Sequence, residues 1–199
     1  MKKFAMLGLL ALSPGCVTTA QEASLEEPQA VTPAIPAEQV AEALASGHRA
    51  FASNGSAQEL ADTAVRLQDL GARPAEDGED NRATTWLSAA RERGLTGETP
   101  PFRGRLLGPA YRSGMLAPGE VSETSQLFLA GEQAEVVAIP VERTDLQLEI
   151  VEGEGERNCT PPATAARSVC RWIPIFTSRY SIRVRNAGNR ASEFYLVTN

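Results

Sequence analysis

The sequence predicts an α+β protein in which a short N-terminal helical unit packs on a C-terminal antiparallel β-sandwich of jelly-roll-like type. Apolar residues recur at helical spacing in the first half of the chain, and they alternate with polar residues in short segments of the second half. The 199 residues are 42% hydrophobic, which suits one domain with an attached helical unit. The expected regions are a signal peptide (1–20), a disordered linker (21–36), the helical unit (37–99), a connector (100–125) and the sandwich (126–199).

The chain begins with the features of an export signal. Two lysines precede nine residues, 4–12, that are apolar apart from one glycine; this stretch is too short to cross a bilayer but typical of a signal peptide. Two processing sites compete. A signal peptidase would cut after Ala20, whereas lipoprotein processing would cut before Cys16 and attach a lipid to it, although Ser13 departs from the usual lipobox. We therefore expect an exported bacterial protein, periplasmic or extracellular, with a membrane-anchored lipoprotein as one form; an uncleaved cytosolic protein is the remaining alternative.

The cysteines agree with export. Either cut removes Cys16 from thiol chemistry and leaves Cys159 and Cys170 as an even pair in an oxidising compartment. A disulfide between them would stabilise the fold by about 3 kcal/mol in the loop-entropy estimate. A metal pair or free buried thiols are the alternatives, and the single histidine, His48, disfavours a metal.

Three short helices are expected in the helical unit. The second begins at Ser56, whose spacing to Glu59 is that of a capping box, and Gly71 is its expected end. Gly94 ends the third helix. Each helix is too short to be stable alone, so the three must pack together or on the sandwich. The expected bounds are residues 37–51, 56–71 and 81–93.

Strand periodicity begins after the connector. Gly131 and Glu132 form a turn between the first two strands, and Pro174 interrupts the fourth, which must therefore lie at an edge or bulge there. Short strands at this spacing are typical of an antiparallel sandwich. The expected strands are residues 126–130, 134–141, 145–151, 169–176, 179–185 and 192–198.

Three of these segments carry a family resemblance. Residues 127–132 with 136–138 resemble an opening strand pair, residues 145–149 resemble an Asp-Leu-Asp-Leu strand, and residues 180–186 with 195–197 resemble a closing hairpin. On these motifs, residues 120–199 resemble the bacterial pre-peptidase C-terminal domain, a β-sandwich module that accompanies secreted peptidases. The resemblance implies a non-catalytic module, and some relatives bind calcium or insoluble polymers.

Calcium is the one cofactor that the sequence brings into consideration, and its signal is weak. Asp145, Glu152 and Glu154 are the candidate ligands, because hard cations take several oxygen ligands from a flexible turn. Gln147 stands where the resembling family has a second acid, which weakens a site built on Asp145. We therefore expect no cofactor.

Five residues are candidates for binding: Tyr111, Arg112, Trp172, Arg183 and Arg185. The first two lie among glycines and proline in the connector, where loops carry recognition residues, although a tyrosine that locks the connector onto the sandwich is the structural alternative. From residue 157 onward there are seven arginines and one acid, so this end could bind anionic envelope polymers. Solvated strand faces are the alternative for the arginines, and core packing for the tryptophan.

The sequence predicts a non-catalytic cell-envelope or secreted binding module. Its partner would be an envelope protein or polysaccharide, and it would meet a membrane only through the lipid anchor. The net charge of −6 argues against nucleic acid. A catalytic His48 would need a nucleophile and an orienting acid, and Ser46, two positions away on the expected helix, faces away from it. A hydrolase using paired carboxylates, or a structural component of an envelope assembly, are the alternatives.

Overall fold

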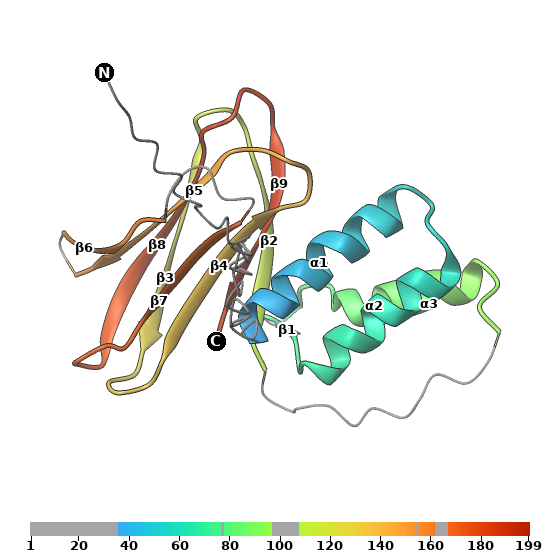
Figure 1. Cartoon of the computed structure of the whole chain (residues 1–199), viewed down its shortest axis with the longest axis horizontal. Coiled ribbons are helices and arrows are strands. Elements are labelled where there is room, and N and C mark those ends of the chain that lie inside the picture. Colours follow the sequence, from blue (N-terminus) through green and yellow to red (C-terminus); the bar gives the residue numbers. More distant parts are fainter. Residues whose placement is uncertain (1–35, 77, 97–107, 154, 162–166) are drawn as a thin grey trace, which may run out of the picture. The chain divides into compact units, whose positions relative to one another are not determined.

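The computed structural model describes residues 36–76, 78–96, 108–153, 155–161 and 167–199 (Figure 1). They belong to one compact unit of the chain. The export signal, both cleavage sites, the linker and Glu154 lie outside the described residues. Among those described, no helix is long and apolar enough to cross a membrane.

The three expected helices are present as α1 (Pro36–Ala52), α2 (Ala57–Asp69) and α3 (Arg82–Glu92). Ser56 caps α2 as predicted, because its hydroxyl oxygen accepts the Glu59 N–H at 3.1 Å. Gly71 follows α2 with a φ of 68°, the left-handed conformation expected of the residue after a helix. The buried faces of the helices meet around Leu44, Leu67 and Trp86.

The predicted antiparallel β-sandwich is confirmed by two sheets. The first has the order β1-β2-β9-β4-β7 and the second the order β3-β8-β5-β6. Every pairing is antiparallel except the short β1–β2 contact. The bounds are β1 (Arg73–Pro74), β2 (Ala110–Leu116), β3 (Val121–Phe128), β4 (Ala134–Pro140), β5 (Leu146–Glu152), β6 (Glu156–Cys159), β7 (Ser168–Trp172), β8 (Ser178–Asn186) and β9 (Ser192–Thr198).

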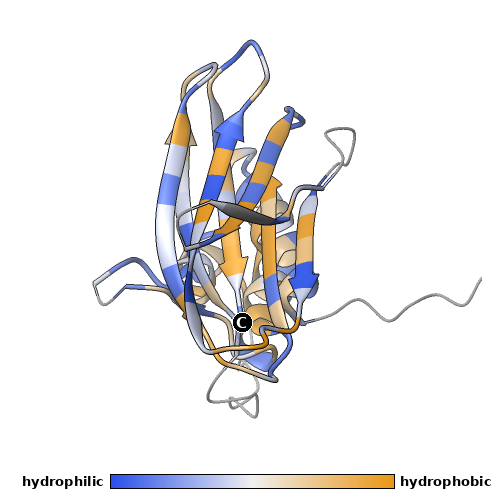
Figure 2. Ribbon diagram, turned by 90° about the vertical axis from the view of Figure 1, so that its left-hand side faces the viewer, coloured by the Kyte–Doolittle hydropathy of each residue, from blue (hydrophilic) through white to orange (hydrophobic). Residues whose placement is uncertain are grey.

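The helices cover the outer face of the five-stranded sheet (Figure 1). One core joins them to β4 and β9 through Val137, Ile139 and Tyr195, and a second core fills the space between the sheets. All seven residues of β4 are buried, since this strand has a core on each face. β9 likewise contributes to both cores, whereas polar and apolar residues alternate along much of β5 and β8 (Figure 2).

The predicted disulfide between Cys159 and Cys170 is present. It joins β6 of one sheet to β7 of the other, across a sequence separation of 11 residues. The bridge therefore fastens the two layers of the sandwich together on the β6–β7 side.

The strand prediction was wrong in several places. The short strands β1 and β6 were not expected at all. β2 and the first half of β3 lie within residues 100–125, where we expected an irregular connector. β7 ends at Trp172, so residues 173–176, expected to be strand, belong to a loop. The edge position expected of this strand is confirmed, because β7 pairs only with β4.

Candidate functional site

A cleft of about 700 Å³ lies between the C-terminal half of α1 and the ends of β2, β4 and β9. We call it the α1 cleft. Its polar walls come from His48 and Arg49 of the helix and from Glu142 and Glu193 of the sheet side. Met115 and Val141 supply apolar surface, and the Met115 side chain is 62% exposed. The cleft is thus amphipathic and open to solvent.

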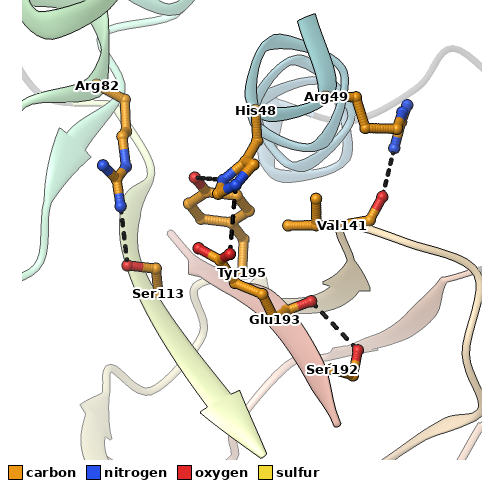
Figure 3. Close-up of polar contacts among 8 residues, drawn as sticks. All are labelled: His48, Arg49, Arg82, Ser113, Val141, Ser192, Glu193 and Tyr195. Carbon is orange, nitrogen blue, oxygen red and sulfur yellow. Dashed lines mark hydrogen bonds and ion pairs between the residues drawn. The ribbon is translucent and has the colours of Figure 1, made fainter. Parts of the chain in front are cut away.

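His48 connects α1 to β9 through both of its ring nitrogens (Figure 3). Nδ1 lies 2.9 Å from the hydroxyl of Tyr195, and Nε2 lies 3.3 Å from a carboxylate oxygen of Glu193. In the neutral ring, Nε2–H donates to the carboxylate while the tyrosine hydroxyl donates to Nδ1. Glu193 thus supplies the orienting acid that the sequence did not reveal, but the hydroxyl at Nδ1 belongs to a buried tyrosine and is not presented to a substrate.

Tyr195 forms the buried support beneath His48. Its ring packs edge-on against Tyr111 at 6.4 Å between centroids, and the Arg82 guanidinium lies 6.0 Å from its centroid. Burial raises the pKa of Tyr195 to about 12, with the Arg82 charge acting in the opposite direction. The hydroxyl therefore stays protonated at neutral pH and remains a donor to the histidine.

Arg49 holds the adjacent wall of the α1 cleft. Its Nη1 donates a hydrogen bond to the carbonyl oxygen of Val141 at 2.9 Å, just beyond the end of β4 (Figure 3). With His48 it fixes the last turns of α1 on the sheet by two contacts to different strands. The walls are consequently pre-formed, which lowers the ordering cost of binding.

The candidate binding residues of the connector make contacts within the fold, and Tyr111 follows the structural alternative stated for it. Tyr111 is buried in β2, where its hydroxyl accepts the Arg82 N–H at 2.8 Å, so it cannot present a surface to a partner. Arg112 bridges the two sheets, donating to the Thr124 hydroxyl at 2.8 Å and pairing with Glu76 at 3.5 Å.

The other three candidates are not brought together into one site. Trp172 is half-buried at the end of β7, in van der Waals range of Phe128 and Tyr180, with ring centroids 4.9 and 5.1 Å away. Arg183 lies on the face of the four-stranded sheet that the helices leave uncovered, between Glu123 at 3.3 Å and Glu149 at 3.6 Å. Arg185 is exposed on the same strand.

The basic C-terminal segment is partly neutralised by acids from other elements. Arg167 pairs with Glu42 of α1 at 2.6 Å, and Arg171 pairs with Glu38 of α1 at 2.8 Å. Together with the acids beside Arg183, these pairs leave the segment less basic as a surface than the sequence count suggested.

The calcium candidates do not converge. Asp145 precedes β5 and Glu152 ends it, so the length of the strand separates them. Glu154 lies outside the described residues. Among the described residues no cluster of three or more His, Cys, Asp or Glu side chains could hold a metal ion.

Sequence reasoning singled out His48 but missed the residues that surround it. Glu193 is the one acid in the basic segment, an isolated charge that could have marked it as a partner for the single histidine. Met115 carried no such signal, because it reaches the cleft only through the pairing of β2 with β9.

Comparison with known proteins defines no family. No protein-family model matches the sequence, and no curated protein matches it. Similar solved structures include the pre-peptidase C-terminal domain of a Bacillus anthracis collagenase, at 9% identity and a TM-score of 0.41, covering 45% of this chain and 88% of that chain. Another is the Aeromonas hydrophila periplasmic inhibitor of g-type lysozyme, at 12% identity and a TM-score of 0.34, covering 46% of this chain and 84% of that chain.

A third similar structure is the Yersinia pseudotuberculosis-derived mitogen, at 13% identity and a TM-score of 0.37, covering 46% of this chain and 85% of that one. At these values the similarities say nothing of function. The β-sandwich implied by the family resemblance is confirmed by the strands themselves, while membership of the pre-peptidase C-terminal family stays a prediction.

Proposed function

We propose that this protein is a non-catalytic binding module of the cell envelope and that it binds its partner in the α1 cleft. The observation that carries the proposal is the engagement of His48 by Tyr195 and Glu193, which turns the single histidine into part of a rigid wall. Export, predicted by the N-terminal segment, and the disulfide are consistent with an envelope location.

The lining of the α1 cleft favours a polypeptide partner over a polysaccharide. Met115 and Val141 offer apolar surface to a side chain, while Arg49 and Glu142 offer both signs of charge to its neighbours. Sugar sites commonly rest on an exposed aromatic platform, and the described residues that line this cleft include no Phe, Tyr or Trp.

Affinity capture with matched variants tests the proposal. The chain from residue 21 onward, with its disulfide intact, is incubated with solubilised envelope and separately with insoluble cell-wall polymer. Met115→Arg fills the cleft while its charge faces Glu193 across the β2–β9 pair. The control Val121→Glu also charges an exposed apolar strand residue and faces Arg185 across the β3–β8 pair.

We expect a saturable protein partner that Met115→Arg loses and Val121→Glu keeps. Equal capture by both variants would remove the α1 cleft from the proposal. A ligand found only in the polymer fraction would replace the polypeptide by a polysaccharide.

The carboxylate hydrolase remains the second candidate because Glu142 and Glu193 both line the cleft. His48 holds the Glu193 carboxylate, which leaves Glu142 as the freer acid. Glu142→Gln separates the two functions: it abolishes turnover of any substrate in a hydrolase, and it changes affinity alone in a binding module.

A further inference from the structure

A second surface lies at the far end of the sandwich, where the β3–β4 and β7–β8 loops meet. Five of the eight large hydrophobic side chains that are exposed in the described part of the chain gather there. We call them the apolar end: Leu127, Leu129, Ile173, Ile175 and Phe176. Ile175 and Phe176 are 83% and 75% exposed, far beyond what a solvated loop requires.

The apolar end is held on a rigid base. The Gly131 N–H donates to the Pro174 carbonyl oxygen at 2.9 Å, and the Ala130 N–H donates to the Thr177 hydroxyl at 3.1 Å, so the two loops are fastened together. They lie side by side at the lower left of Figure 1. Beneath them the rings of Phe128, Trp172 and Tyr180 pack with centroids 4.9 to 5.7 Å apart.

The charges around the apolar end are mixed. Arg179 faces Leu127 across the β3–β8 pair, and Glu132 lies in the β3–β4 loop. Glu152 lines a cleft that Ile175 and Phe176 of the apolar end also line. Whatever covers this surface must therefore be attracted by its apolar side chains more than by net charge.

Helix α1 begins at the same end of the sandwich. The Ala37 N–H donates to the Glu135 carboxylate, and Glu38 pairs with Arg171 at 2.8 Å. Glu135 and Arg171 face each other across the β4–β7 pair, within two residues of the loops that carry the apolar end. The chain that precedes Pro36 therefore enters the fold beside the apolar end, whereas the α1 cleft lies toward the other end of the helix.

We propose that the apolar end rests on the lipid bilayer. The candidate lipid site, Cys16, is twenty residues before Pro36, a length of chain that spans at most about 70 Å. A lipid on Cys16 would tether the fold through Pro36, beside the apolar end, and the loops would add a second, direct contact to that anchor. In this arrangement the α1 cleft faces away from the bilayer, so the contact adds to the proposed function without depending on it.

Vesicle binding of the lipid-free chain, residues 21–199, isolates the direct contact from any anchor. Phe176→Trp places a fluorophore in the apolar end, and its emission should shift to the blue with vesicles of phosphatidylethanolamine and phosphatidylglycerol. Adding Ile175→Glu to this variant should lower the partition coefficient by about tenfold or more. Val121→Glu, an exposed apolar residue at the opposite end of β3, is the matched control and should leave the partition unchanged.

Several results would overturn the membrane contact. One is the absence of any emission shift, and another is equal partition with Ile175→Glu when thermal melting shows both variants folded. If vesicle binding requires phosphatidylglycerol and salt abolishes it, the attraction would come from charged residues and not from the apolar end. If the chain does not bind vesicles but captures an envelope protein saturably, and Ile175→Glu loses that capture, the apolar end would be a binding surface for a polypeptide. None of these results touches capture at the α1 cleft, which Met115→Arg reports separately.

Discussion

Gly47 lies where helix α1 passes Trp86 of α3, and replacing it by alanine tests the packing that positions His48. A β-carbon at this position would lie 2.2 Å from Cζ3 of the indole and 2.7 Å from Cε3. Carbon atoms in contact are normally about 3.5–4.0 Å apart. Trp86 is only 1% exposed and cannot swing aside, so the helix itself must shift.

The expected magnitude combines two opposing contributions. Alanine favours the helix over glycine by about 0.5–1 kcal/mol, and overpacking of a core costs about 1–3 kcal/mol or more. An overlap above 1 Å with a fixed ring belongs at the upper end of that range. We therefore expect Gly47→Ala to lower the free energy of unfolding by about 2 kcal/mol.

Urea unfolding followed by circular dichroism measures the change, and a second variant isolates its cause. Trp86→Leu removes the six-membered ring that the new methyl group would strike. In that background Gly47→Ala should become stabilising by about 0.5–1 kcal/mol, since only the helix preference remains. A neutral or stabilising Gly47→Ala in the otherwise unchanged chain would refute the close approach of the two helices.

Three further changes test other parts of the fold. His48→Ala should destabilise by about 1 kcal/mol, because the buried Tyr195 hydroxyl loses its bond to the histidine but keeps Arg82 as a side-chain partner; chemical unfolding at neutral pH measures this, and an unchanged midpoint would contradict the contact. Replacing Cys159 and Cys170 together by serine should cost about 3 kcal/mol for a separation of 11 residues, and an equal stability of oxidised and variant chains would contradict it. The pKa of Tyr195 is raised to about 12 by burial, so stability should fall as pH rises from 10 toward 12, where the unfolded chain loses a proton that the folded chain keeps. Burial also raises the pKa of Tyr111 and Tyr180, so Tyr195→Phe should reduce that slope without removing it, and an identical slope would be the contrary result.

The helices and the later strands other than β6 could be predicted because their signals are local. Ser56 caps α2 by a contact three residues away, and β9 has the expected bounds, residues 192–198. The positive φ of Gly71 and Gly94 likewise follows from what a helix end requires of the next residue.

β2 and the first half of β3 escaped prediction because the inner faces of these two strands are not uniformly apolar. In β2, Gly114 leaves room for Phe194, whose ring carbon Cε1 would lie 2.8 Å from an added β-carbon. In β3, Thr124 and Gln126 point toward the other sheet yet meet the polar side chains of Arg112 and Thr198. Apolar alternation, the signal used to find strands, is therefore missing at this edge of the sandwich.

The sequence indicated one residue of the α1 cleft and not the residues that contact it. His48 draws attention as the single histidine, but Glu193 and Tyr195 follow it by more than 140 residues. They reach it because β9 lies at the centre of the sheet on which α1 packs. Pairing of that kind is set by the tertiary fold, and no local pattern encodes it.

A binding isotherm measured with the captured partner tests the binding function most directly. Titrating this partner into the unaltered chain, into Met115→Arg and into Val121→Glu gives three dissociation constants under one condition. We predict that Met115→Arg weakens binding by about tenfold or more, a loss of about 1.4 kcal/mol or more, while Val121→Glu matches the unaltered chain. An unchanged affinity for Met115→Arg, or conversion of the partner into a product during the titration, would contradict a non-catalytic binding site in the α1 cleft.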